Sequence, residues 1–287
     1  PIRKCYPQRF SHVPDLLDHF EAQSRHSDFD LRLGLAKTYD GLTGILNPKS
    51  WSGSTPKIDE AYPAGAQPAS RILDVLVQHP RLRLQSPGGS GKTTFLAGAV
   101  KACVDAGRTV FFLDLSRRVD PHATEAQAIF DMVSVGASYG QVRRALEQEE
   151  SGQVILFVDG LNEQSATADV LVKEIEQWVR ADQSKACLVL AGRMKVFGES
   201  LLEYHLACIR PLPAKEIRKA LGSQAPARPH PLLATPFFLD LRLKREAGPA
   251  DEVRLKSDEL EAYLRRVIFE DGALEALSLA AWNVYSK

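Results

Sequence analysis

The stretch Ser86-Pro87-Gly88-Gly89-Ser90-Gly91-Lys92-Thr93-Thr94 decides the fold of this 287-residue chain. It follows a strand predicted at Arg81–Gln85 and opens a helix predicted at Gly91–Val104, which is the context that a phosphate-binding loop (P-loop) requires. Glycines let the backbone curl so that successive N–H groups point at one phosphate, and the helix N-terminus adds its positive end. The motif therefore predicts that Lys92 neutralises the β- and γ-phosphates of a nucleotide and that the Thr93 hydroxyl ligates Mg²⁺.

The motif departs from the usual pattern at one position, because Ser86 stands where the first glycine is expected. A serine fits there if its backbone angles are ordinary. The alternative is a glycine-rich turn followed by a chance Lys-Thr pair, and the strand and helix on either side count against it. The residues expected to line the nucleotide phosphates are Pro87, Gly88, Gly89, Ser90, Gly91, Lys92, Thr93 and Thr94.

A second motif, VILFVDGLNE over residues 154–163, is an apolar strand that ends in a carboxylate. Ligands bind at the carboxyl ends of strands in open α/β sheets, so Asp159 is predicted to hold Mg²⁺ together with Thr93. Glu163 is predicted to polarise the attacking water. An exposed Asp-Gly turn is an equally good interpretation of this motif alone, but the P-loop beside it favours the catalytic one.

A third motif, LVLAGR over residues 188–193, brings Arg193 to the same edge of the sheet. A guanidinium there can contact the γ-phosphate through two hydrogen bonds, although a surface arginine explains the motif alone equally well. One predicted strand, Thr109–Leu115, lies in sequence between the P-loop strand and the Asp159 strand. That spacing is expected of NTPases with an extra central strand and a glutamate base, and it disfavours simple nucleotide kinases.

The alternation of strands and helices predicts an α/β fold, with a parallel five-stranded sheet flanked by helices and followed by a helical lid. The predicted strands are Arg81–Gln85, Thr109–Leu115, Gln153–Val158, Ala186–Ala191 and Cys208–Pro211. After Pro213 only helices are predicted, at Ala214–Leu221, Leu232–Glu246, Ser257–Glu270 and Ala273–Tyr285. We divide the chain into an N-terminal extension or linker of unknown role (1–70), a nucleotide-binding domain (71–213) and a helical subdomain (214–272).

Near the N-terminus, an amphipathic helix is predicted around Pro14–Gln23. Three histidines, His12, His19 and His26, recur every seven residues in this region. On one helix, neighbours with that spacing lie about 10 Å apart, so one metal ion cannot bridge them. We interpret them as packing or solvated side chains.

Composition excludes several classes of protein. Lys and Arg number 36, as do Asp and Glu, and the zero net charge argues against a dedicated nucleic-acid-binding domain. No apolar run approaches the roughly 20 residues of a membrane helix. The cysteines are too scattered for a zinc or CxxC site and indicate buried thiols in a reducing, cytoplasmic setting. They are Cys5, Cys103, Cys187 and Cys208.

In their order, the motifs GGSGKTT, VFFLDL, VILFVDGLNE, LVLAGR and HPLLATPFFLDL resemble the NACHT branch of the STAND NTPases, over about residues 70–287. That branch has a small residue after the Mg²⁺ aspartate, as Gly160 is here. Two acidic residues usually follow. This chain has Asn162 and Glu163 at these positions, so Glu163 is the one candidate base that remains. Pro236 matches a family proline that packs near adenine, and residues 273–287 resemble the start of a winged-helix subdomain.

The resemblance implies an ATP/ADP-binding switch with slow ATPase activity, the nucleotide-binding and oligomerisation module of a larger signalling or defence protein. Effector and sensor domains would flank it, and we expect this chain to be a piece excised from such a protein. Exchange of ADP for ATP would allow self-association. An ATPase motor or loader of the AAA+ type, acting on nucleic acid or protein, is the alternative, which Gly160 and Pro236 disfavour. A small-molecule kinase would need an acceptor site, and the sequence shows none.

Overall fold

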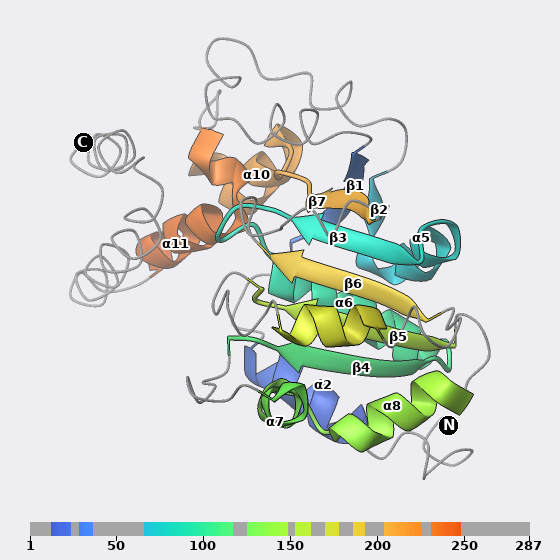
Figure 1. Cartoon of the computed structure of the whole chain (residues 1–287). Helices are drawn as coiled ribbons and strands as arrows, with labels where there is room; N and C mark the ends of the chain where they lie inside the picture. Colours follow the sequence, from blue (N-terminus) through green and yellow to red (C-terminus); the bar gives the residue numbers. More distant parts are fainter. Residues whose placement is uncertain are drawn as a thin grey trace.

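The computed structural model describes residues 13–23, 29–36, 66–116, 125–148, 153–161, 170–177, 186–192, 204–224 and 231–247. Within these ranges seven strands form one sheet in the order β2-β1-β7-β3-β6-β5-β4 (Figure 1). The strands are β1 (Arg32–Ala36), β2 (Gln67–Pro68), β3 (Arg81–Gln85), β4 (Thr109–Asp114), β5 (Val154–Asp159), β6 (Cys187–Gly192) and β7 (His205–Ile209).

Five of these strands are parallel, which confirms the predicted α/β fold. β3 pairs with β7 on one side and β6 on the other, and β6, β5 and β4 follow in parallel register. β6 therefore separates the P-loop strand from the Asp159 strand, as expected for an extra central strand. Every residue of β4, β5 and β6 is buried, because helices cover both faces of a parallel sheet.

The other two strands are antiparallel and were not predicted. β1 pairs with β7, and the two-residue β2 pairs with β1. The β1 sequence RLGLA is short and contains an arginine and a glycine, so its own pattern favours no strand. The prediction for β7 was also wrong at both ends, since the strand begins at His205 and ends before Pro211, which has no N–H to donate to a ladder.

The helices form a layer on each face of the sheet. They are α2 (Val13–Gln23), α5 (Ile72–Gln78), α6 (Lys92–Asp105), α7 (Ala126–Val133), α8 (Tyr139–Gln148), a helix over residues 170–177, α10 (Ala214–Leu221) and α11 (Pro236–Ala247), with short 3₁₀ turns at η2 (Ala69–Arg71), η4 (Gly222–Gln224) and η5 (Pro231–Ala234). α2 confirms the predicted N-terminal helix. The helix predicted at Leu232–Glu246 is instead broken at Thr235, because the residue before a proline avoids helical angles and Pro236 starts a new helix.

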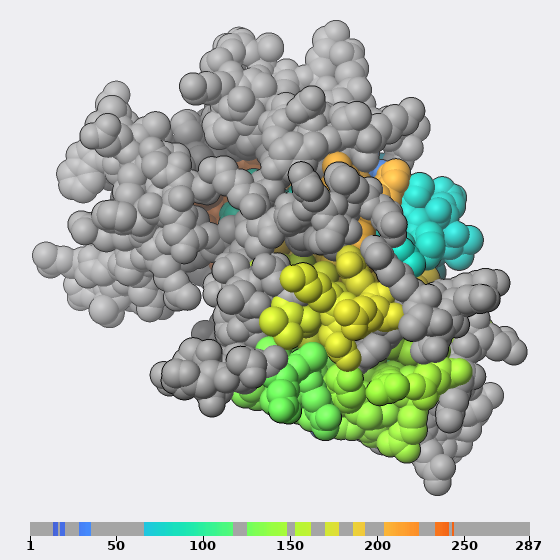
Figure 2. Space-filling view, viewed as in Figure 1, coloured from blue at the N-terminus to red at the C-terminus, as the bar shows by residue number. Residues whose placement is uncertain are grey.

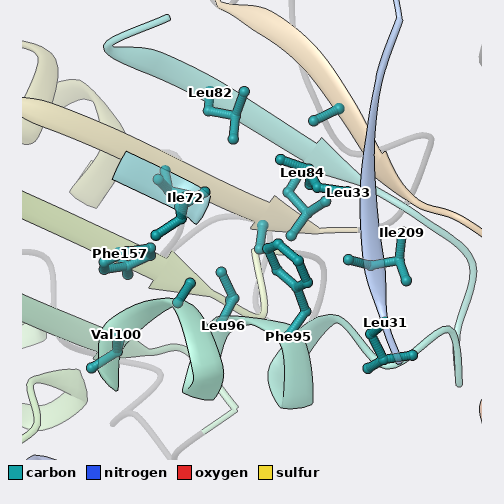
Figure 3. Close-up of a cluster of buried hydrophobic side chains, with 14 of the residues drawn as sticks. Leu31, Leu33, Ile72, Leu82, Leu84, Phe95, Leu96, Val100, Phe157 and Ile209 are labelled. Atoms are coloured by element: carbon teal, nitrogen blue, oxygen red, sulfur yellow. The ribbon is translucent and has the colours of Figure 1, made fainter. Parts of the chain in front are cut away.

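Two hydrophobic clusters hold these layers to the sheet. One joins α2, α5, α6, α10 and α11 to one face, and Figure 3 shows Phe95 of α6 pointing toward Leu84 of β3 and Leu33 of β1. The other joins α7, α8 and the 170–177 helix to the opposite face, which Figure 2 shows from outside. Phe111 belongs to one cluster and Phe112 to the other, so alternate side chains of one strand serve both layers.

The described part of residues 1–70 belongs to this same core, since Leu16 and Phe20 of α2 and Leu33 of β1 are buried in it. The domain limits at residues 70, 213 and 272 stay predictions, and the helices predicted at Ser257–Glu270 and Ala273–Tyr285 lie outside the described residues. Nowhere in the described ranges is a helix both long and apolar enough to cross a membrane.

Three of the four cysteines support the buried-thiol interpretation. Cys103, Cys187 and Cys208 are buried thiols outside any disulfide, and Cys5 lies outside the described residues. Burial raises the pKa of the Cys103 thiol to about 12, so this side chain stays protonated and unreactive.

Candidate nucleotide-binding site

The P-loop motif forms the connection between β3 and α6, as predicted. Gly89 and Gly91 have φ angles of +72° and +87°, a left-handed conformation that glycine adopts without strain. Gly91 is the N-cap of α6, and its carbonyl accepts a 2.8 Å hydrogen bond from the N–H of Phe95. The loop therefore ends directly on the positive end of a 14-residue helix.

Lys92 folds back over this loop. Its Nζ donates hydrogen bonds to the carbonyl oxygens of Ser86, at 2.8 Å, and of Pro87, at 2.9 Å. The ammonium group is thus held at the start of the loop, beside the N-terminus of α6. A cation and a helix N-terminus together make a site suited to an anion such as a phosphate.

Thr93 and Asp159, the two predicted Mg²⁺ ligands, are in direct contact. The Thr93 hydroxyl donates a 2.6 Å hydrogen bond to Oδ2 of Asp159, and the N–H of Gly160 donates to Oδ1 at 2.8 Å. Burial raises the pKa of the Asp159 carboxyl above its usual value, and the Thr93 bond, the Lys92 charge and the Gly160 bond oppose that rise.

A divalent cation fits these two residues, because a hydroxyl and a carboxylate are the hard oxygen ligands that Mg²⁺ prefers. The described residues contain no cluster of three or more His, Cys, Asp or Glu side chains that could hold a metal by themselves. Phosphate oxygens and water would have to complete the coordination, as is usual for Mg²⁺ bound with a nucleotide.

Ser86, the one departure from the motif, has a structural role that the sequence did not reveal. Its Oγ accepts a 2.7 Å hydrogen bond from the N–H of Ile209, where β7 ends. Its own N–H donates to the carbonyl of Gly192, at the end of β6, at 3.3 Å. A glycine could make only the second of these bonds, so the serine fastens the start of the loop to both neighbours of β3.

Backbone hydrogen bonds also join the carboxyl ends of the other parallel strands. The N–H of Leu115 donates to the carbonyl of Asp159 at 2.9 Å, and that of Leu161 donates to the carbonyl of Ala191 at 3.2 Å. Glu163 and Arg193, the other two predicted catalytic residues, lie just outside the described residues, as does Asn162. Their roles stay predictions.

The lid contacts the loop through the first residues of α11. The N–H of Phe237 donates to the carbonyl of Gly89 at 3.2 Å. A Cβ placed on Gly89 would lie 2.7 Å from Cβ of Phe237, and one placed on Gly91 would lie 2.7 Å from Leu31 and 3.6 Å from Pro236. The structure therefore brings Pro236 to the loop, while its contact with adenine stays a prediction. The parts played by Leu31 and Phe237 were not predicted.

Comparison with known proteins assigns this chain to no family and finds solved structures of low sequence identity. No protein-family model matches the sequence, and no curated protein does either. AMPPCP-bound DnaA from Aquifex aeolicus is 16% identical, over 76% of this chain and 74% of that one, with a TM-score of 0.38. A DNA replication initiation factor is 13% identical, over 76% and 66% of the two chains, with a TM-score of 0.38. PCH-2 from C. elegans is 14% identical, over 68% and 53%, with a TM-score of 0.33.

Proposed function

We propose that this chain binds ATP and ADP, hydrolyses ATP slowly, and uses the exchange between them as a molecular switch. The observation that carries the proposal is that Lys92, Thr93 and Asp159 lie together at the carboxyl ends of the parallel strands. The N–H groups of the loop and the N-terminus of α6 bind the phosphates, and Lys92 exchanges its carbonyl partners for phosphate oxygens.

Each remaining residue has one role in this proposal. Bound Mg²⁺ supplies positive charge to the β- and γ-phosphates, and Thr93 and Asp159 hold it. Glu163 orients and deprotonates the attacking water, and Arg193 binds the γ-phosphate. Pro236 packs near adenine.

The switch is supported by the contact between the lid and the loop. Since the Phe237 N–H bonds to the Gly89 carbonyl, a change at the phosphates reaches α11 without passing through any other element. A nucleotide shifts such an equilibrium only if it binds the two lid positions with different affinity, so ATP and ADP must differ in this respect. The resemblance to NACHT proteins adds self-association and flanking effector and sensor domains in a cytoplasmic protein of immunity, cell death or anti-phage defence.

The first test is to denature the purified protein and identify the released nucleotide by chromatography. We expect stoichiometric ADP. A titration with fluorescent mant-ATP then compares the wild type with Lys92→Ala, for which we expect no binding because the phosphates lose their main cation. Lys101→Ala is the matched control, because Lys101 lies on the same helix in an exposed 3.0 Å ion pair with Asp105.

Unchanged mant-ATP affinity in the Lys92→Ala variant would reject the P-loop assignment. Fast ATP turnover stimulated by DNA would reject the switch and favour the AAA+-type motor. Slow turnover that DNA does not change is the expected result.

A further inference from the structure

A second buried carboxylate lies beside Asp159, at the end of the neighbouring strand. Asp114 ends β4, is directly paired in register with Asp159, and is equally buried, with 6% and 7% of the two residues exposed. Phe112 and Phe157, two residues earlier in each strand, belong to the same hydrophobic cluster as α6. Because side chains alternate along a strand, the two carboxylates lie on that same face, where Thr93 meets Asp159.

The Asp114 carboxylate is held in place through both of its oxygens. Oδ1 accepts hydrogen bonds from the N–H and the hydroxyl of Ser116, at 3.0 and 2.5 Å. Oδ2 lies 3.5 Å from Nε2 of His19, which α2 brings to the edge of the sheet. The His19 side chain is only 11% exposed, and its ring packs against Phe20 and Phe112 with centroid distances of 5.3 and 5.7 Å.

Two carboxylates in this arrangement repel each other, and the charge of Asp114 contributes to the raised pKa of Asp159. Burial weakens the screening of that repulsion by water. The same negative charge attracts a cation bound at Asp159. Ser116 and His19 hold the Asp114 carboxylate in place, so the contribution that we assign to it is that of a fixed charge beside Asp159.

We propose that Asp114 is a positioning residue of the nucleotide site, whose charge, fixed by Ser116 and by His19 of α2, raises the affinity of the Thr93–Asp159 pair for a divalent cation. This inference rests on the proposed function of the P-loop. It also gives the N-terminal helix α2 a direct link to the site, through one histidine.

Titration of mant-ATP binding with MgCl₂, and separately in EDTA, tests the proposal in Asp114→Asn. We expect the Mg²⁺ concentration for half-maximal binding to rise about fivefold or more, because a buried charge beside the cation is lost. In EDTA, binding stays unchanged or becomes tighter, because the same substitution removes a negative charge near the triphosphate. A merely structural role of Asp114 would weaken binding in both conditions.

Asp105→Asn is the matched control. It removes the same charge from the far end of α6, where Asp105 forms an exposed ion pair, and we expect no change in either titration. His19→Ala and Ser116→Ala keep the charge of Asp114, but each removes one contact that fixes its carboxylate. Each should therefore raise the Mg²⁺ requirement by a smaller factor, about twofold. These two variants carry the test if Asp114→Asn fails to fold.

The proposal fails if Asp114→Asn leaves the Mg²⁺ requirement unchanged. If Asp114→Asn does not fold, the proposal fails if His19→Ala and Ser116→Ala both leave that requirement unchanged. It also fails if binding weakens equally with and without Mg²⁺. Failure of the proposed function looks different. In that case the wild type itself binds no mant-ATP in either condition, and Asp114 has no nucleotide site to serve.

Discussion

The Thr93 hydroxyl donates a 2.6 Å hydrogen bond to Oδ2 of Asp159, a residue 66 positions later in the chain. Thr93 belongs to the first turn of α6, which follows β3, whereas Asp159 ends β5, two strands away in the sheet. The bond spans this distance because α6 crosses the face of the sheet and contacts both β5 and β4. It joins the loop that would bind phosphate to the strand that would hold Mg²⁺.

Replacing Thr93 with valine keeps the shape of the side chain and removes the hydroxyl. A buried carboxylate then loses a donor, so we expect the free energy of unfolding without nucleotide to fall by about 1–2 kcal/mol. Mg²⁺-dependent binding of mant-ATP should be lost as well. Thr94→Val, the same substitution at an exposed neighbour, is the control for stability in urea denaturation. Equal effects of the two substitutions would contradict the role of the hydroxyl.

The two serines of the loop make a second matched pair. Ser86→Ala leaves the buried N–H of Ile209 without its acceptor, which costs about 1–3 kcal/mol of folding stability. Ser90 Oγ is buried and has no hydrogen-bond partner among the described residues, so Ser90→Ala should be neutral or slightly stabilising. Urea denaturation midpoints measure both. The prediction is wrong if Ser90→Ala is the more destabilising of the two.

Gly89→Ala tests the contact between the loop and the lid. The added Cβ would lie 2.7 Å from Cβ of Phe237, in addition to the backbone cost of a positive φ angle. Gly107→Ala is the control, because Gly107 has a φ of +75° and no atom within 4 Å of the added Cβ. We expect Gly107→Ala to cost about 1–2 kcal/mol and Gly89→Ala to cost more, with faster proteolysis at α11. Equal losses would mean that the loop and α11 do not touch in solution.

Stability should depend on pH through two stacked histidines. The rings of His79 and His205 lie 3.7 Å apart, and burial, with a smaller contribution from His79, lowers the pKa of His205. The unfolded chain therefore binds a proton at a higher pH than the folded one. The stability that His205 contributes is fully present above the pKa of an unfolded histidine, about 6.5. This contribution is lost as the pH falls through the lower pKa of the folded state.

His205→Phe keeps an aromatic ring in this stack and removes the proton-binding site. Thermal melts between about pH 7.5 and 5 should show a smaller loss of stability in this variant than in the wild type. The same slope in both proteins would assign the pH dependence to other groups.

Glu163→Gln addresses the predicted general base, which lies outside the described residues. We expect ATP hydrolysis to slow by about 10²-fold or more, with mant-ATP affinity unchanged, because the amide cannot accept the proton of the attacking water. Glu147→Gln is the control, since Glu147 lies in an exposed 3.0 Å ion pair with Arg143 on α8. Undiminished turnover would move the role of the base to another residue.

Four strands and the helix after the loop could be predicted to within one residue. β4, β5 and β6 are nearly continuous apolar runs because both of their faces are buried. β3 (RLRLQ) is placed by the P-loop motif that follows it, and α6 begins where that motif ends. This pattern is local and needs no knowledge of a partner strand. The positions of Lys92, Thr93 and Asp159 could be predicted for the same reason, because each lies at the end of an element whose direction the motif implies.

The remaining features depend on contacts between distant parts of the chain. β1 exists as a strand because β7 pairs with it, and nothing in RLGLA predicts that partner. Three further contacts also join distant parts of the chain and could not be predicted. They are the Ser86–Ile209 hydrogen bond, the contact of Phe237 with Gly89 and the contact of His19 with Asp114. Asp114 could have been suspected from VFFLDL, whose strand ends in an acid just as the Asp159 strand does.

The position of β3 in the sheet has a consequence for how the protein is made. Both of its neighbours, β6 and β7, are encoded after it, so this strand leaves the ribosome with neither hydrogen-bonding edge covered. At roughly 5–20 residues per second, the interval of about 100 residues before Cys187 lasts about 5–20 seconds. During that time Leu82 and Leu84 offer a strand edge on which two nascent chains can pair, and a chain cut before Cys187 carries the whole P-loop motif without either strand that supports it.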